Sequence, residues 1–266
     1  MLSSNPTKRL RVFAGPNGSG KSTIVEAIQK YRVNGRALDF GVYVNADDIA
    51  QALRNDAFSF KKYELQPLTR KEFVAIAQGT GLIRDTFSEV EFAASFSLNA
   101  DGQLKLKKAH WHEHLAQLLA TVLRERLLEQ QQKISFETVF SHPSKLEFMR
   151  RAKEQGYKIY LYFVATEDPA INIARIKEVR VMTGGHDVSE DKIRRRYERS
   201  LDLLFDAAAL AYQAWFFDNS RDLSARDQKV EPFAHFKVIG GKRVWDPLEY
   251  AKIPTWFVNA YLSKVR

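Results

Sequence analysis

The sequence predicts an α/β protein with a mostly parallel, five-stranded sheet that is flanked by helices and interrupted by one inserted segment. Three observations support this prediction. Short β-prone runs alternate with segments of helical apolar spacing, which is the order expected of a parallel sheet with crossover helices. A glycine-rich turn at residues 15–20 joins the first β-prone run to the first helical segment. Residues 55–108 do not follow the alternation.

The elements before residue 55 are short and clearly separated. Residues 9–14 (RLRVFA) are β-prone, and the helical spacing of KSTIVEAIQKY predicts a helix over 21–31. Residues 42–45 predict a second strand, and residues 46–54 a second helix. The chain therefore begins as strand, glycine-rich loop, helix, strand and helix.

The elements after residue 108 continue the alternation. Amphipathic spacing predicts a long helix over 111–131. Gly156 is expected to end a helix over 144–155, and Pro169 suits the first turn of another. Residues 158–165 are nearly all apolar, as a strand buried on both faces should be. The remaining expected elements are strands at 134–137 and 214–218, an edge strand at 235–239 and a terminal helix over 254–265.

The segment 55–108 is rich in Phe, Ser and Lys. Residues 96–98 and 104–106 flank Asn-Ala-Asp-Gly, which favours a β-hairpin turn. We interpret 55–108 as an insertion that contains a β-hairpin and helices, carried by a single domain over residues 1–266. Its aromatic residues fit a core better than a platform for stacking bases.

Composition narrows the function classes. Lys and Arg number 41 and Asp and Glu 32, so the formal charge is +9 and anionic partners are expected. The absence of cysteine excludes disulfides, thiolate nucleophiles and cysteine-based metal sites. The longest apolar run, 159–165, is far shorter than the roughly 20 residues of a membrane helix. The N-terminus has no apolar signal region, so a cytoplasmic protein is expected.

The glycine-rich turn matches G-x-x-x-x-G-K-S between a strand and a helix, the context in which this pattern binds nucleotide phosphates. Its residues are Gly15, Pro16, Asn17, Gly18, Ser19, Gly20, Lys21 and Ser22, followed by Thr23. Glycines let backbone N–H groups approach an oxyanion, and the helix dipole adds positive charge. Lys21 can reach the β- and γ-phosphates, and Ser22 can offer its hydroxyl to Mg²⁺. The fold is therefore predicted to be that of P-loop NTPases and kinases, with ATP and Mg²⁺ as cofactors.

Two sets of acids follow predicted strands. Asp47 and Asp48 lie after the second strand, where one could accept a hydroxyl proton during phosphoryl transfer or cap the next helix. Glu137 ends the strand ISFE and is followed by Thr138. Glu137 could orient Mg²⁺ through water, bind substrate, or be an exposed strand-end acid.

Residues 175–200 form an arginine-rich segment around Gly184-Gly185-His186, which suggests a lid with glycine hinges. Arg175 and Arg180 are the candidates to contact the transferring phosphoryl group, although a charge run is also typical of a solvated helix face. The histidines at 110, 112 and 114 are two residues apart, which spreads the three of them around a helix, so they do not predict a metal site.

Four segments together resemble the zeta-toxin family of P-loop kinases, most closely its chromosomal branch. They read GPNGSGKST, VNADDIA, FETVFSHPSKLEFMRRAKEQGYKIYLYFVA and ARIKEVRVMTGGHDVSEDKIRRRYERSL. The resemblance covers roughly residues 8–54 and 110–220 and leaves 55–108 without a counterpart. It implies an ATP-dependent kinase that phosphorylates the sugar 3′-hydroxyl of UDP-N-acetylglucosamine, together with a cognate antitoxin.

The resemblance also implies residue roles. Lys21 would bind the β/γ-phosphates, Asp47 would be the catalytic base, and Arg175 a phosphate contact on the lid. Glu137 and Thr138 would lie near the sugar, with Ser22 and Glu137 near the metal. The sequence departs from the family in having Val139 where related sequences have threonine, and His186 where plasmid-borne members have a second lid arginine. Either Arg180 takes over that role or the role is lost.

Two alternatives remain open at this point. A kinase for another acceptor, such as a nucleoside, an antibiotic or a nucleic-acid end, would share the loop and the lid. A basic nucleic-acid-binding protein that uses ATP as a switch would also fit the charge, although the chain has no nucleic-acid-binding module signature.

Overall fold

The structure is a computed structural model that describes residues 8–55, 57–83, 88–107, 112–183, 189–221 and 231–265. The chain divides into two compact units: unit 1 comprises residues 1–40 and 137–266, and unit 2 comprises residues 41–136. Unit 2 therefore contains the expected insertion together with the elements on either side of it. No helix among the described residues is long and apolar enough to cross a membrane.

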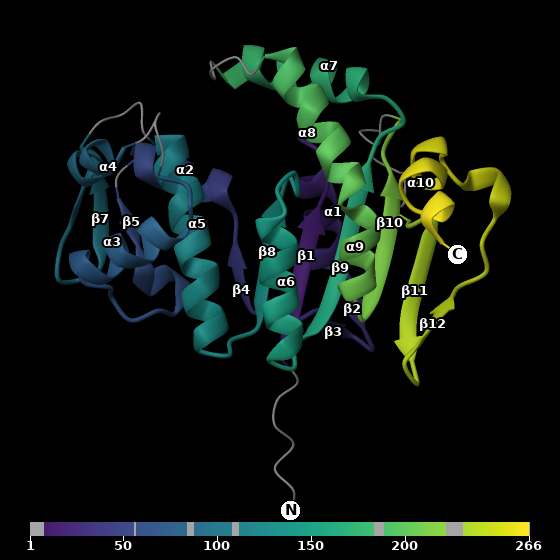
Figure 1. Cartoon of the computed structure of the whole chain (residues 1–266), viewed down its shortest axis with the longest axis horizontal. Helices are drawn as coiled ribbons and strands as arrows, with labels where there is room; N and C mark the ends of the chain where they lie inside the picture. Colours follow the sequence, from purple (N-terminus) through teal and green to yellow (C-terminus); the bar gives the residue numbers. More distant parts are fainter. Residues whose placement is uncertain are drawn as a thin grey trace, which may run out of the picture. The chain divides into compact units, whose positions relative to one another are not determined.

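Unit 1 carries the strand order β12-β11-β10-β9-β1 of a seven-stranded sheet (Figure 1). Its strands are β1 (Arg9–Ala14), β9 (Lys158–Ala165), β10 (Gln213–Asp218), β11 (Ala234–Ile239) and β12 (Lys242–Trp245). β9 pairs in parallel with both β1 and β10, whereas β11 and β12 continue the sheet antiparallel. The other two strands are β8 (Ile134–Thr138), whose last two residues belong to unit 1, and β4 (Val42–Val44).

The five strands expected from the sequence are all present, as β1, β4, β8, β9 and β10. The expected total of five is wrong, because β11 and β12 extend the edge beyond β10. The apolar run of β9 is buried from Leu161 to Ala165, as a central strand with a neighbour on each side requires.

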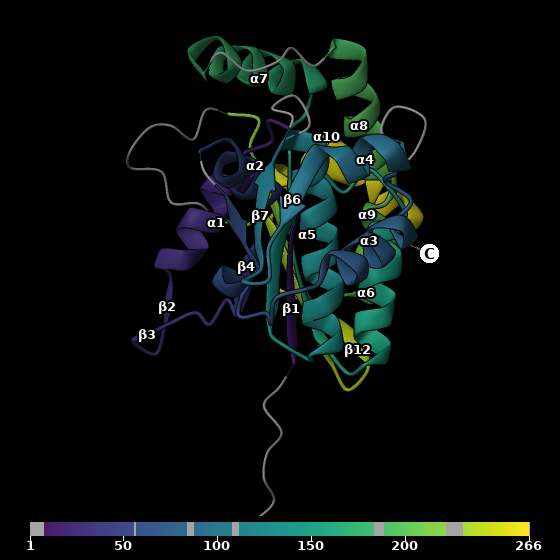
Figure 2. The same ribbon diagram turned by 90° about the vertical axis from the view of Figure 1, so that its left-hand side faces the viewer.

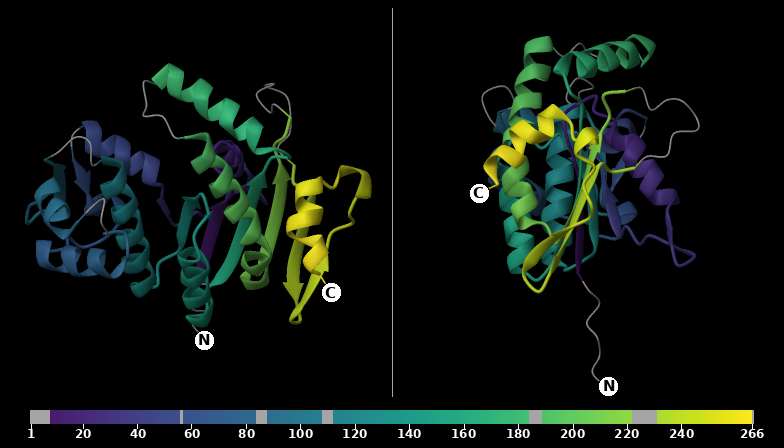
Figure 3. Two further views of the ribbon diagram at one scale, coloured as in Figure 1. Left: turned by 45° about the horizontal axis from the view of Figure 1, so that its top comes forward. Right: turned by 90° about the vertical axis from the view of Figure 1, so that its right-hand side faces the viewer.

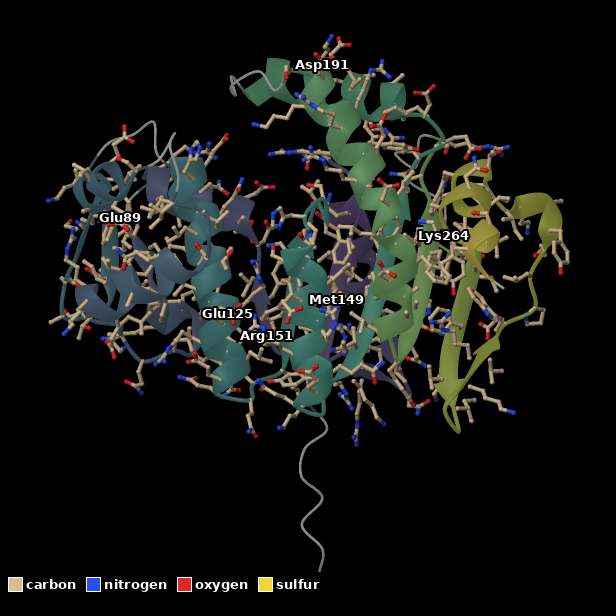
Figure 4. All side chains as sticks on the ribbon, viewed as in Figure 1. Glu89, Glu125, Met149, Arg151, Asp191 and Lys264 are labelled. Atoms are coloured by element: carbon tan, nitrogen blue, oxygen red, sulfur yellow. The ribbon has the colours of Figure 1, made fainter. Side chains whose placement is uncertain are left out.

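Helices cover both faces of the unit 1 sheet. α1 (Lys21–Lys30) packs on β1 and β9 from one face, and α6 (Ser144–Glu154) and α9 (Leu204–Leu210) pack on β9 from the other (Figures 2 and 3). Met149 of α6 is fully buried beneath that helix (Figure 4). The helix ends as expected at Gly156, which has φ +84° and donates to Lys153 O while Tyr157 N donates to Ala152 O.

The other elements of unit 1 are short or lie at the strand ends. They are β2 (Arg32–Val33), β3 (Arg36–Ala37), α7 (Pro169–Thr183), α8 (Glu190–Asp202), η3 (Tyr250–Lys252), α10 (Thr255–Ala260) and η4 (Leu262–Lys264). The expected terminal helix over 254–265 is not continuous. Tyr261 leaves helical geometry with φ −126° and ψ −60°, and its buried ring packs on Phe257 and Trp245.

Unit 2 has its own aromatic core. Besides β4 and most of β8 it contains α2 (Ala46–Asn55), β5 (Phe58–Ser59), η1 (Phe60–Tyr63), α3 (Arg70–Gly79), α4 (Glu89–Ser95), β6 (Phe96–Leu98), β7 (Gln103–Leu106) and α5 (His112–Glu129). β6 and β7 pair antiparallel across the Asn-Ala-Asp-Gly turn. Phe73 is fully buried, and its ring contacts those of Phe60, Phe92 and Phe96. These rings therefore serve as core.

Candidate nucleotide site and acceptor acids

The glycine-rich loop connects the end of β1 to the start of α1 in unit 1. Gly15, Gly18 and Gly20 have φ values of +145°, +74° and +89°, which residues other than glycine rarely adopt. Close neighbours add a second reason for glycine, because a β-carbon at Gly15 would lie 2.0 Å from Val164 O. The loop therefore has a backbone that only this glycine pattern allows.

Gly20 is the N-cap of α1 and has no side chain with which to cap it. The first N–H groups of a helix have no intrahelical partner, and they carry the positive end of the helix dipole. An anionic phosphate is a suitable partner for such a terminus. Lys21 lies at this end of the helix, and its Nζ donates to Pro16 O at 2.8 Å, which bends the ammonium group back over the loop.

Ser22 and Glu137 lie together. The Ser22 hydroxyl donates to Glu137 Oε2 at 3.2 Å, which joins the first turn of α1 to the end of β8. Mg²⁺ in nucleotide sites commonly keeps water ligands and takes only one or two protein oxygens beside the phosphates. A hydroxyl and a carboxylate at hydrogen-bond distance fit that donor set.

Within the described ranges, no cluster of three or more His, Asp or Glu side chains could hold a metal by itself. A Mg²⁺ ion at Ser22 and Glu137 would therefore need nucleotide phosphates and water to complete its coordination.

Two asparagines that the sequence did not single out contact the loop from outside. Asn172 of α7 donates from Nδ2 to Asn17 O at 2.7 Å, and Asn219, just after β10, donates from Nδ2 to Ser19 O at 2.9 Å. Both side chains are buried. Their partners are 155 and 200 residues away in sequence, so no local pattern could identify them.

Arg175 is placed on α7, but its guanidinium does not reach into open space. It donates to the backbone carbonyls of Asn219 at 2.9 Å and Arg221 at 3.3 Å. Arg180 lies in α7, and its side chain is outside the described part. Gly184, Gly185 and His186 also lie outside the described residues.

Two contacts fix the described parts of α7 and α8, the helices of the arginine-rich segment. Lys177 of α7 and Glu190 of α8 form an ion pair at 2.5 Å, and the lysine lowers the pKa of the Glu190 carboxyl. Tyr197 of α8 donates its hydroxyl to Thr166 O at 2.5 Å, at the end of β9. Arg194 and Arg195 are exposed.

Thr138 and Val139 follow Glu137 at the end of β8. The Thr138 hydroxyl oxygen accepts from Phe140 N at 3.2 Å. Phe140 is buried and has φ +57°, an uncommon left-handed conformation for a bulky residue. The Thr138 bond thus supports a sharp turn that follows the two acceptor-side candidates Glu137 and Thr138.

Asp47 and Asp48 lie in unit 2, on the first turn of α2. Neither carboxylate is the N-cap, because Asn45 takes that place and its Oδ1 accepts from Asp47 N at 2.9 Å. Both aspartates are exposed. The pKa of the Asp48 carboxyl is raised above its ordinary value. Partial burial of the group is the main cause, nearby Lys62 opposes the rise, and the charge of Asp47 adds to it. Burial and the charge of Asp48 raise the pKa of Tyr63 to about 12.

Unit 1 thus brings together the loop, Lys21, Ser22 and Glu137, while Arg175 donates to the backbone carbonyls of Asn219 and Arg221. Asp47 and Asp48 belong to the other unit, beside Lys62 and Tyr63 of the inserted segment. Sequence reasoning missed Asn172, Asn219, Lys62 and Tyr63. Only the position of Asn219 directly after a predicted strand offered a signal for any of them.

Comparisons with known proteins give distant matches. No protein-family model matches the chain. A stretch of 61 residues is 39% identical to an uncharacterized protein of Haemophilus influenzae, and the match covers 23% of this chain and 43% of that protein. The chain thus spans less than half the length of this relative.

Two solved structures are similar over most of the chain. A chain from the PezAT chromosomal toxin–antitoxin system of Streptococcus pneumoniae is 14% identical, with a TM-score of 0.44, and the match covers 86% of this chain and 76% of that one. A chain of the AvrRxo1-ORF1:ORF2 complex with ATP is 15% identical, with a TM-score of 0.44, and the match covers 94% of this chain and 63% of that one. At these identities and scores the neighbours assign no role to a residue of this chain.

Proposed function

We propose that this protein is an ATP-dependent kinase that phosphorylates a hydroxyl of UDP-N-acetylglucosamine or a related nucleotide sugar. The observation that carries the kinase proposal is the loop between β1 and α1. Its positive-φ glycines precede Lys21, and Ser22 is hydrogen-bonded to the strand-end acid Glu137. These are the parts with which a phosphoryl-transfer site holds a nucleoside triphosphate and its metal.

The reaction moves the γ-phosphoryl group from ATP to an acceptor oxygen. The bond between the γ-phosphorus and the β,γ-bridging oxygen breaks, and a new bond forms between that phosphorus and the acceptor oxygen. The acceptor hydroxyl gives its proton to Asp47, and the products are ADP and the phosphorylated acceptor. Lys21 stabilises the negative charge on the phosphates, and catalysis is mostly positioning and charge stabilisation. Mg²⁺, when bound near Ser22 and Glu137, neutralises phosphate charge.

Asp47 is the favoured base for two reasons. It matches the acid position after the second strand in the family that the sequence resembles. It also does not cap α2, because Asn45 caps that helix. Asp48 has the raised pKa and lies near Lys62, which suits a role in orienting the acceptor. Arg175 and Arg180 are proposed as lid residues that approach the phosphates when nucleotide is bound.

The nucleotide-sugar acceptor rests on the family resemblance of the VNADDIA and FET segments. In the same proposal the protein acts as the toxin of a toxin–antitoxin pair in the cytoplasm, and an antitoxin protein is its partner. Residues 55–108 then contribute to acceptor recognition, since Lys62 and Tyr63 lie near Asp48. A different small acceptor is the second candidate, favoured by Val139 at the position where related sequences carry threonine.

The test is ATP consumption by the purified protein with and without UDP-N-acetylglucosamine, with mass spectrometry of the sugar nucleotide. We expect a product heavier by one phosphoryl group, absent with Lys21→Ala. Lys30→Ala, which changes an exposed lysine at the other end of α1, is the matched control and should retain the product.

Other outcomes separate the candidates. ATP binding without a modified sugar would reject this acceptor and lead to a screen of nucleosides, antibiotics and nucleic-acid ends. Nucleic-acid binding that falls steeply with salt, without transfer to any small acceptor, would support the nucleic-acid-binding ATPase instead.

A further inference from the structure

The carbonyl groups of the phosphate loop need partners of their own. When successive N–H groups of a loop point inward at an anion, the carbonyls between them point outward. A buried carbonyl without a hydrogen bond is costly, so each outward carbonyl should find a donor. In unit 1, Asn17 O and Ser19 O receive theirs from the side-chain amides of Asn172 and Asn219.

The amide of Asn172 is held in the orientation that presents Nδ2 to the loop, and the backbone of Asn219 is held in place beside it. The oxygen of the Asn172 side chain accepts from the Thr166 hydroxyl, which leaves its nitrogen facing Asn17 O. The Asn219 backbone carbonyl accepts from Arg175 at 2.9 Å, which fixes the segment after β10. The two donors are therefore supplied by α7 and by the segment that follows β10.

Asn219 shows the contribution of donation most clearly. Asn219 is 5% exposed, and its buried Oδ1 has no hydrogen-bond partner among the residues that the structure describes. An unpaired buried oxygen destabilises the fold, and an apolar side chain of similar size would avoid that cost. Only the amide, however, offers an N–H to Ser19 O. The same side chain fills the space behind Gly20, where a β-carbon would lie 2.1 Å from Asn219 Nδ2.

We infer that Asn172 and Asn219 are positioning residues that set the shape of the phosphate loop for nucleotide binding. The inference rests on the proposed function. The loop contains three glycines in the left-handed region and would sample many conformations without external contacts. The two amides restrict the loop to the conformation in which Asn17 O and Ser19 O meet their donors. Because Asn172 lies on α7, they also couple the loop to the base of the lid.

The experiment measures the dissociation constant of MgATP, by calorimetry, for the full-length protein and for Asn172→Ala, Asn219→Ala and Asn219→Asp. Phe236→Leu is the control: it changes a fully buried residue of β11, so it lowers stability without touching the loop. All variants are measured at one temperature at which each of them is fully folded, so neither partial unfolding nor the temperature dependence of binding changes the comparison.

We expect each asparagine-to-alanine change to weaken MgATP binding about tenfold, the effect of losing roughly one hydrogen bond's net contribution. Asn219→Asp should weaken it further, because a carboxylate would face Ser19 O without a donor. Phe236→Leu should bind as wild type does. If Asn219→Asp does not fold, the two alanine variants carry the test.

Affinities of both alanine variants equal to that of Phe236→Leu would overturn the inference while leaving the kinase proposal intact. Absence of MgATP binding by the wild type would overturn the kinase proposal itself. The two failures are therefore distinguishable.

Discussion

The side-chain amide of Asn219 occupies the space into which a side chain at Gly20 would project. A β-carbon built on Gly20 would lie 2.1 Å from Asn219 Nδ2 and 3.3 Å from Asn219 Cγ. Asn219, which lies far from Gly20 in the sequence, thus excludes any larger residue at this last glycine of the loop. Gly20 is therefore required for two reasons: its backbone has a positive φ, and Asn219 leaves no room for a side chain.

The first prediction concerns Gly20→Ala, which should destabilise the protein more than Gly156→Ala does. Both glycines have similar positive φ values, +89° and +84°, but nothing lies within 4 Å of a β-carbon at Gly156. The two variants share the backbone strain, so the difference in their melting temperatures measures the clash with Asn219. Equal melting temperatures would show that the loop yields to the added methyl group.

The second prediction concerns the metal. Glu137→Gln should raise the Mg²⁺ concentration needed for half-maximal ATP turnover by about tenfold, because the amide lacks the charge that orients the metal. A magnesium titration of turnover measures the shift. Glu147→Gln, which alters an exposed acid on α6, is the control. An unchanged magnesium requirement in Glu137→Gln would remove Glu137 from the metal site.

The third prediction separates the two aspartates of α2. Asp47→Asn should keep MgATP affinity within severalfold and lose transfer by about a hundredfold or more, because the acceptor proton has no base. Asp48→Asn should retain more transfer and weaken acceptor binding. Steady-state kinetics with varied acceptor, alongside MgATP calorimetry, distinguish the two. Transfer lost in Asp48→Asn and kept in Asp47→Asn would exchange their roles.

The fourth prediction follows from the raised pKa of Asp48. Because its carboxyl binds a proton more tightly in the folded state, this group's contribution to stability is greatest below the ordinary value of 3.8. That contribution is lost as the pH rises through the folded-state pKa. Asp48→Asn should therefore melt above wild type at about pH 7, and the difference should shrink as the pH falls towards about 4. Thermal unfolding across this range measures it.

The control for the pH experiment is Asp101→Asn, in an exposed turn of the same unit. The difference in melting temperature between Asp101→Asn and wild type should not change comparably with pH. A melting temperature for Asp48→Asn that stays below wild type at neutral pH would mean that attraction to Lys62 outweighs the cost of burying the charge.

The fifth prediction concerns the core of unit 2. Phe73→Ala should lower the free energy of unfolding by about 3–5 kcal/mol, because it empties a fully buried site among aromatic rings. Chemical denaturation followed by circular dichroism measures the loss. Val90→Ala on α4, where the side chain is 79% exposed, should change little. A small effect of Phe73→Ala would mean that the neighbouring rings collapse into the space.

The sequence located the elements that local patterns encode. The phosphate loop was visible because its glycines, lysine and serine are consecutive, and the five parallel strands because their apolar runs are short and bounded. β12 was missed, although Gly240 and Gly241 between two β-prone runs are a hairpin signal. α3 and α4 also carried readable starts, since Thr69 and Ser88 each form a capping box with a glutamate three residues later.

Neighbouring residues encode the chemistry of the loop: a backbone that needs glycine, a lysine and a hydroxyl at fixed spacing, and acids at the ends of strands. The side chains that support that loop, in contrast, are chosen by the packing of distant segments. Asn172 and Asn219 donate to Asn17 and Ser19 across 155 and 200 residues. Such contacts depend on how the strands pair and where α7 packs. A hydrogen bond between residues so distant in the chain leaves no pattern in the sequence near either of them.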